Sequence, residues 1–243
     1  GVRLGASGFV RHSPPGRLDL RLDWRASATG YDQPDYDRVD GELSFSLRHR
    51  GARRTWSAGP FVRKAWLNDG ADSTARGARV TLGRTLPEAR HLSLAMSHEM
   101  RTYKGAAYRD GPANSLSFVI QQTPSQRLVV WAGIVLEDVR PAAAHQAYTG
   151  RRVLAGAQHR WRDGWQTRLQ LDIGDRAFAA DYPLTDAPRH DDIVSVRIGA
   201  QTSRVSLWGL SPEVSCTHTR NKSSIALADF DSTECDLSLT RKF

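Results

Sequence analysis

The chain of 243 residues lacks long hydrophobic runs and has very little cysteine. Its longest apolar stretch, residues 128–136, is about half of the roughly 20 residues that a membrane-spanning helix needs. A helical membrane protein is therefore excluded. The two cysteines, Cys216 and Cys235, are too few for a disulfide-rich scaffold or for a zinc cluster.

The remaining composition is that of a polar, basic protein, with a formal net charge of +8 and a mean hydropathy of −0.49. Taken literally, these values suggest a soluble protein that could bind nucleic acid. Apolar residues and the seven tryptophans are spread along the whole length, which argues against disorder. The pattern of the residues, however, contradicts the nucleic-acid hypothesis, and we expect no nucleic-acid partner.

Alternation of apolar and polar residues with a period of two dominates the sequence. Within residues 16–27, positions 18 to 26 place Leu, Trp and Ala on one face, and positions 17 to 25 place Arg and Asp on the other. This period is typical of a strand with one apolar and one charged face, and we find no convincing helical period. Thirteen such strands are predicted, at 2–11, 16–27, 37–50, 55–66, 76–86, 90–103, 114–122, 127–139, 150–161, 164–174, 192–201, 204–219 and 232–243. A slip of parity within 204–219 predicts a bulge near Gly209 or Pro212.

The connections between these strands alternate between short and long. Short turns such as residues 123–126 alternate with long loops such as 175–190, and all six tyrosines lie in or beside the long loops. Bacterial outer-membrane barrels have short periplasmic turns, long outer loops and aromatic residues at both membrane interfaces. The prediction is one all-β domain over 1–243, a transmembrane up-and-down antiparallel β-barrel in contact with outer-membrane lipids and lipopolysaccharide. The alternative is a soluble β-sandwich or a lipocalin-like fold.

The odd number of strands has a topological consequence. Single-chain bacterial barrels normally have an even strand count with both ends in the periplasm. We therefore expect that thirteen of fourteen strands are present and that the first strand, with a periplasmic domain before it, is missing.

The last 36 residues carry a recognisable pattern. Residues 208–243 resemble the end of the surface lipoprotein assembly modifier (Slam) family, which has a Trp-Gly-x-x-Pro strand, an Arg-Asn-containing loop and a final strand that ends in Phe. The matching positions are Trp208, Gly209, Pro212, Arg220, Asn221, Ser223, Ile225 and Phe230, whereas Ser224 stands where asparagine is usual. Outward-facing Leu237, Leu239 and the terminal Phe243 resemble the signal that the barrel-assembly machinery reads.

The resemblance implies an outer-membrane barrel of fourteen strands, preceded by a periplasmic tetratricopeptide-repeat domain. It implies a protein that moves lipoproteins, or small secreted proteins, to the cell surface through its barrel. The client would be the lipoprotein or secreted protein itself, and no cofactor is implied.

The charged face of the predicted strands is the candidate translocation path. It also serves, in a structural interpretation, as a set of cross-strand charge ladders that hold the barrel in shape. The predicted lumen residues are Arg17, Arg21, Arg25, Arg38, Asp40, Glu42, Arg48, Glu99, Arg101, Arg152, Arg168 and Asp172. Excess arginine would also suit a second hypothesis, a porin-like channel for small anionic solutes.

Signals for catalysis are poor. No HExxH, G-x-S-x-G, Walker or dinucleotide motif is present, so we expect neither an enzyme nor a metal site. A third hypothesis is a barrel hydrolase, with Ser97, His98 and Glu99 as its cluster. Cys216 and Cys235 lie on the last two strands at similar distances from the hairpin tip. They either form a cross-strand disulfide or, the option that we favour, remain two small lipid-facing residues.

Overall fold

The computed structural model describes residues 2–30, 37–67, 72–183, 185, 187–202, 204 and 211–240, and for residues 2, 3, 239 and 240 it describes only the backbone. Within these residues the chain forms thirteen strands and three short 3-10 turns. The strands are β1 (Val2–His12), β2 (Leu18–Gly30), β3 (Arg38–Arg50), β4 (Arg54–Leu67), β5 (Ser73–Leu86), β6 (Arg90–Tyr103), β7 (Gly111–Ser125), β8 (Leu128–Val139), β9 (Tyr148–Arg160), β10 (Trp165–Asp181), β11 (Pro188–Thr202), β12 (Ser211–Ser223) and β13 (Phe230–Thr240).

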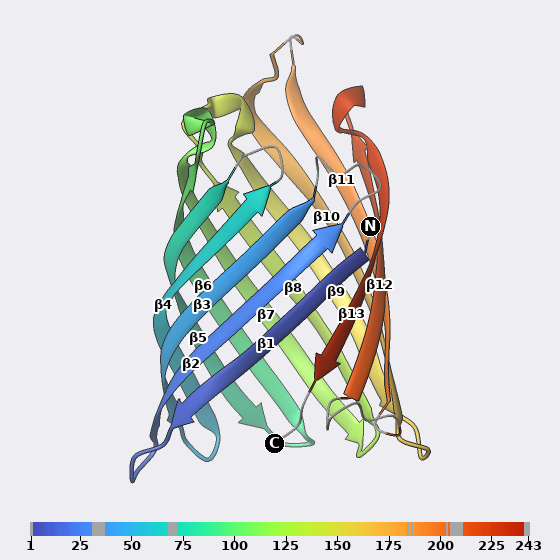
Figure 1. Cartoon of the computed structure of the whole chain (residues 1–243). Helices are drawn as coiled ribbons and strands as arrows, with labels where there is room; N and C mark the ends of the chain where they lie inside the picture. Colours follow the sequence, from blue (N-terminus) through green and yellow to red (C-terminus); the bar gives the residue numbers. More distant parts are fainter. Residues whose placement is uncertain are drawn as a thin grey trace.

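The strands close into a single barrel in which each strand pairs with its neighbours in sequence (Figure 1). All of these sequential pairings are antiparallel, and β1 closes the barrel by pairing with β13 in parallel. The connections at one end, such as residues 126–127 between β7 and β8, are short, and we call this the short-turn end. The opposite end, with connections such as 140–147, is the long-loop end.

Two neighbouring rows of residues show how the faces are divided. Trp24, Leu43 and Val62 are direct cross-strand partners on β2, β3 and β4, and all three are exposed on the outer surface. The next row, Arg25, Glu42 and Arg63, points into the barrel. Because soluble proteins seldom expose contiguous apolar surface, this outer face is a lipid-facing one. The prediction of a transmembrane up-and-down β-barrel is confirmed.

No helix in the described part of the chain has the length and apolar character required to cross a membrane.

The strand positions agree with the prediction at most ends, with two corrections. Residues 175–190 are mostly strand rather than a long loop, because β10 continues to Asp181 and β11 begins at Pro188. The pairing of these two strands shifts register between Ala177 and Asp181. Backbone pairing thus continues beyond the point where the side-chain pattern becomes loop-like. The predicted strand 204–219 is observed as β12, which spans Ser211–Ser223 in the described residues. The predicted bulge is absent at Pro212, which pairs with Leu239 in regular register, and the other predicted position, Gly209, lies outside the described residues.

Among the described residues, the β1–β13 seam is the shortest strand pairing. Residues 2–5 of β1 pair with residues 235–238 of β13, whereas β1 pairs with β2 along its whole length. Figure 1 shows the two strands side by side near the start of β1 and diverging towards the short-turn end. Among the described residues, 6–12 of β1 have no strand partner on this side.

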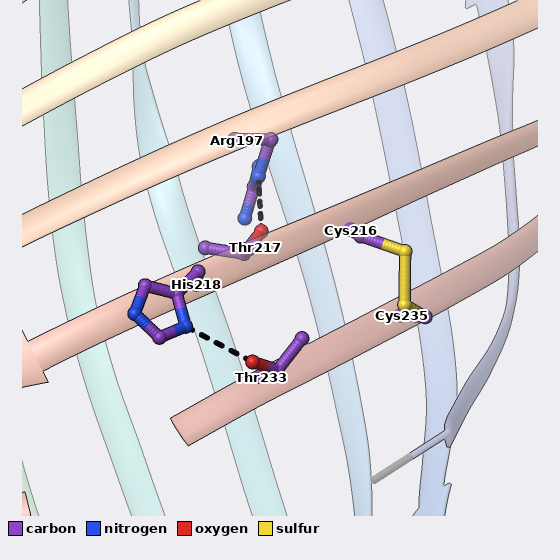
Figure 2. Close-up of a disulfide and its surroundings, with 6 residues drawn as sticks. All are labelled: Arg197, Cys216, Thr217, His218, Thr233 and Cys235. Carbon is purple, nitrogen blue, oxygen red and sulfur yellow. Dashed lines mark hydrogen bonds between the residues drawn. A yellow bond between two sulfur atoms is a disulfide. The ribbon is translucent and has the colours of Figure 1, made fainter. Parts of the chain in front are cut away.

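A disulfide joins the last two strands (Figure 2). Cys216 of β12 lies directly opposite Cys235 of β13, with their Cα atoms 4.1 Å apart, which is typical of a non-hydrogen-bonded antiparallel pair. Their cross-strand neighbour Ile198 is 61 % exposed on the outer face, so both cysteines face outward as expected. The favoured prediction of two separate thiols is wrong, because the register places the two residues directly opposite each other.

Removing this disulfide should lower the free energy of unfolding of the barrel by about 2–4 kcal/mol, because the bond closes a loop in the unfolded chain. The test is chemical denaturation of the Cys216→Ser, Cys235→Ser double variant in detergent, beside Thr217→Ser as a control on the same strand. Equal denaturation midpoints for the wild type with and without a reductant would contradict the prediction.

Candidate functional site

The barrel lumen contains the candidate site. A cavity of about 620 Å³ lies towards the long-loop end, between the inner faces of β2 to β6. Its wall is polar because the inward positions of these strands are Arg, Asp, Glu, Ser and Thr. Five of the predicted residues line this one cavity, namely Arg25, Arg38, Asp40, Glu42 and Arg101.

Glu99 anchors the wall beside this cavity. Its carboxylate accepts hydrogen bonds from the Arg63 guanidinium at 2.9 and 3.0 Å and from Arg101 Nε at 2.5 Å. Glu99 is only 6 % exposed, whereas the two arginines keep about a third of their side-chain surface in the lumen. A buried carboxylate that holds two guanidinium groups fixes their direction, so that β4 and β6 present a defined basic surface.

A second cavity of about 310 Å³ lies towards the short-turn end. Arg25 and Glu42 line both cavities, and Arg48 lines this one. Arg79 stacks over the buried ring of Phe61 at 4.9 Å and lies 3.8 Å from Glu42. Polar lining therefore follows β2 to β5 from one end of the lumen towards the other.

The opposite wall carries a separate chain of polar contacts. Arg168 donates to Gln170 at 3.2 Å, and Gln170 donates to Asp172 at 2.8 Å, all on β10. Arg152 of β9 lies 3.8 Å from Asp172. Arg168 also stacks over Trp131 of β8, with its guanidinium 4.8 Å from the ring centre. The predicted lumen residues thus divide into two groups, one on β2 to β6 and one on β9 and β10.

Two arginines near the start of β2 differ in their placement. Arg21 lies inside the barrel, where it pairs with Asp23 and stacks over Phe9 at 4.0 Å. The prediction that Arg17 lies on the lumen face of a strand is wrong. Arg17 lies in the exposed turn before β2. The strand begins two residues later than predicted, because turn residues can continue the pattern by chance.

Several lumen residues were not predicted. Aromatic rings occupy inward positions and lie beneath arginines, and further basic and acidic groups lie nearby. These residues are Phe9, Phe61, Arg63, Tyr103, Arg109, Trp131, Tyr148, Arg176, Phe178, Arg189 and Asp191. An aromatic residue on the polar face weakens the period-two signal, and Arg63 is hidden because Lys64, its neighbour on the outer face, is also basic.

The C-terminal motif stabilises a loop rather than lining the lumen cavities. Asn221 is 1 % exposed and donates its side-chain amide to the Ala228 carbonyl at 2.7 Å. Ile225 is also buried, and its amide donates to Ser223 Oγ at 3.2 Å. Ser224 bonds with the backbone of His190 in both directions, which ties the loop to β11.

The remaining motif positions are less enclosed. Arg220 and Phe230 are exposed, and Pro212 pairs with Leu239 at the short-turn end of β12 and β13. Trp208 and Gly209 lie outside the described residues. Of the predicted assembly signal, Leu237 is 44 % exposed on the outer face, Leu239 is placed only by its backbone on β13, and Phe243 lies outside the described residues.

The hydrolase cluster is not assembled. Ser97 and Glu99 point into the barrel, where Ser97 bonds with Ser115 at 2.8 Å. His98 lies on the outer face and bonds with Asn114 at 2.8 Å. A general base on the opposite side of the sheet cannot activate Ser97. Among the described residues, no group of three or more His, Cys, Asp or Glu side chains could hold a metal ion.

Replacing Glu99 with Ala should lower the free energy of unfolding by about 1–3 kcal/mol, because Arg63 and Arg101 lose their shared carboxylate. The matched control is Asp138→Ala, which removes an exposed pair with Arg140 and should cost less than about 1 kcal/mol. Denaturation curves of both variants check this. Similar losses in the two variants would show that burial of Glu99 adds nothing.

The chain is similar to known proteins over most of its length. The family model described as "Surface lipoprotein assembly modifier" matches residues 17–243. Surface lipoprotein assembly modifier 1 of Haemophilus influenzae (strain ATCC 51907 / DSM 11121 / KW20 / Rd) is 20% identical over 221 residues, which cover 88% of this chain and 46% of that protein. The chain therefore spans less than half the length of this relative.

Among solved structures, the siderophore receptor PirA from Pseudomonas aeruginosa is similar at 11% sequence identity and a TM-score of 0.45, covering 98% of this chain and 54% of the receptor. Because the family model covers nearly the whole chain, with strands β2 to β13 and the C-terminal motif inside the match, the chain belongs to the surface lipoprotein assembly modifier family.

Proposed function

We propose that this chain is the outer-membrane barrel of a translocator that moves lipoproteins, or small secreted proteins, to the cell surface. The observation that carries the proposal is a charged lumen inside a barrel of this family. The exposed apolar side chains around the barrel support placement in the outer membrane, since a closed sheet leaves few backbone groups unpaired in lipid. The short-turn end then faces the periplasm.

The lumen pairs suit a passing polypeptide. Arg38 forms a fork with Asp40, and the Arg38 side chain is 44% exposed. Pairs that are this exposed contribute only about 0–1 kcal/mol, so a guanidinium can exchange its partner for a carboxylate or carbonyl of the client. The buried Glu99 keeps the framework fixed while such exchange occurs. A path made of many weak, replaceable contacts guides a chain without trapping it.

The β1–β13 seam supports a second part of the proposal, on chain organisation. We propose that in the whole protein a fourteenth strand precedes β1 and lies between β1 and β13, with a periplasmic repeat domain before it. A strand there would be antiparallel to both neighbours and would pair with the free edge at residues 6–12. The sequence that the gene encodes upstream is the check on this point, and a gene without a further strand would refute it.

We also propose that the barrel-assembly machinery recognises Leu237, Leu239 and Phe243, and that lipopolysaccharide surrounds the long-loop end. The exposed position of Leu237 on the outer face of β13 is consistent with such a signal.

Surface display of a client tests the translocation path. Arg38→Gln, Arg79→Gln and Arg152→Gln together should lower client display several-fold, because all three point into the lumen, pair with carboxylates there and keep nearly half of their side-chain surface exposed. Display is measured by protease accessibility of the client on intact cells that produce the full-length protein.

The matched control is Arg90→Gln, Arg140→Gln and Arg151→Gln, which removes the same charge and three exposed ion pairs outside the lumen. This control should leave display unchanged at equal barrel levels. Equal display in the two triple variants would refute the lumen path.

The porin-like alternative has one observation in its favour. The larger cavity is lined by five arginines, which outnumber its acidic residues Asp40, Glu42 and Glu234. A porin would give a large, steady and anion-selective current in planar bilayers without a client, and the lumen triple variant would abolish the selectivity. We expect instead a low conductance that changes when a client lipoprotein is added. A steady anion current without a client would favour the porin.

A further inference from the structure

The outer face of the barrel carries a groove that the translocation path does not use. The groove has a volume of about 330 Å³ and crosses β4 to β7 near the short-turn end. Its floor is a row of direct cross-strand partners, Trp56, Leu82, Leu94 and Phe118. A continuous row of apolar side chains such as this one can accept a hydrocarbon chain.

Two arginines form one end of this groove. Arg54 and Arg84 are direct partners across β4 and β5, one step closer to the short-turn end than Trp56 and Leu82. Like charges directly opposite each other destabilise a sheet. Within the described part of the chain neither arginine has an acidic partner, although nearby Arg90 pairs with Glu88. The barrel therefore contains an uncompensated pair of guanidinium groups beside an apolar groove.

The position of the arginine pair indicates the chemical class of the ligand. At the short-turn end of the lipid-facing surface, the pair lies where lipid headgroups meet the apolar layer. A phosphate between the two guanidinium groups would neutralise the repulsion and accept hydrogen bonds from both. An acyl chain attached to that phosphate would lie along the row from Leu82 to Phe118.

We propose that this groove, the Arg54–Arg84 groove, is a binding site for an anionic glycerophospholipid of the periplasmic leaflet. Two arginines with no acidic partner among the described residues favour a headgroup of net negative charge over a zwitterionic one. The acyl chains of a client lipoprotein would fill the groove without using the arginines, so they fit the site less well. The proposal rests on the membrane placement given above but not on the route of the client.

Native mass spectrometry of the delipidated protein in detergent tests the site, with phosphatidylglycerol and phosphatidylethanolamine as probes. The wild type should retain phosphatidylglycerol in preference. The Arg54→Gln, Arg84→Gln double variant should bind it roughly tenfold or more weakly, since two charge-assisted hydrogen-bonding groups are lost. The Arg54→Lys, Arg84→Lys variant keeps the positive charge but loses the paired N–H donors of the guanidinium groups, and it should bind phosphatidylglycerol with intermediate strength.

Arg127→Gln with Arg162→Gln is the matched control, because both arginines are exposed in other short turns. It should bind as the wild type does. Leu92→Trp, which fills the groove but keeps both arginines, should also weaken phosphatidylglycerol binding. If inorganic phosphate competes fully and Leu92→Trp has no effect, the site binds free phosphate and the proposal is wrong.

Equal retention of the two lipids, or equal binding by the Gln double variant and its control, would also overturn the proposal. Neither result would affect the proposed function, because client display by the same Gln double variant is measured separately. Far-ultraviolet circular dichroism confirms that each variant is folded.

Discussion

The requirement that lipid-facing backbone groups be hydrogen-bonded governs this structure. Hydrocarbon offers no hydrogen-bond partners, so each strand must be paired on both sides and the sheet must close. Closure then divides every strand into a lipid-facing and a lumen-facing set of residues. One rule for the backbone thereby produces an apolar exterior and a charged interior from a chain whose mean hydropathy is that of a soluble protein.

Among the described residues, this constraint is met least completely at the β1–β13 seam. A closed barrel of thirteen strands forces one parallel pairing, and here it involves only residues 2–5 and 235–238. The disulfide between Cys216 and Cys235 fixes β13 to β12 at the same level, so the seam lies beside the covalently strengthened part of the wall. Any opening of the barrel wall is therefore easier between β1 and β13 than between β12 and β13.

The lumen shows how fixed and replaceable charges are combined. Glu99 is buried with two arginines, whereas Arg38, Arg79 and Arg152 hold more exposed pairs. The aromatic rings beneath several arginines limit the directions in which these side chains can move. On the outer face, Arg54 and Arg84 have no acidic partner among the described residues, and this contrast with the lumen arginines underlies the proposed lipid site.

The sequence by itself determined the fold class, the thirteen strands and the lumen face of most of the charged residues that were predicted to lie there. These features depend on the alternation of apolar and polar residues along a single strand, and this alternation can be read from neighbouring residues in the sequence. The places of Glu42, Glu99 and Asp172 inside the barrel follow from that pattern. The extension of β10 and β11 into 175–190 does not follow from that pattern, because the pairing of these residues depends on the neighbouring strand rather than on their own composition.

Only the tertiary structure decided which residues meet. The register places Cys216 opposite Cys235, and the curvature of the wall brings Arg63, from another strand, to Glu99. The same holds for the rings under the lumen arginines and for the groove at Arg54 and Arg84, whose members come from several strands. Register and closure are properties of paired strands, and a residue's own neighbours in the sequence carry no information about the partner across the sheet.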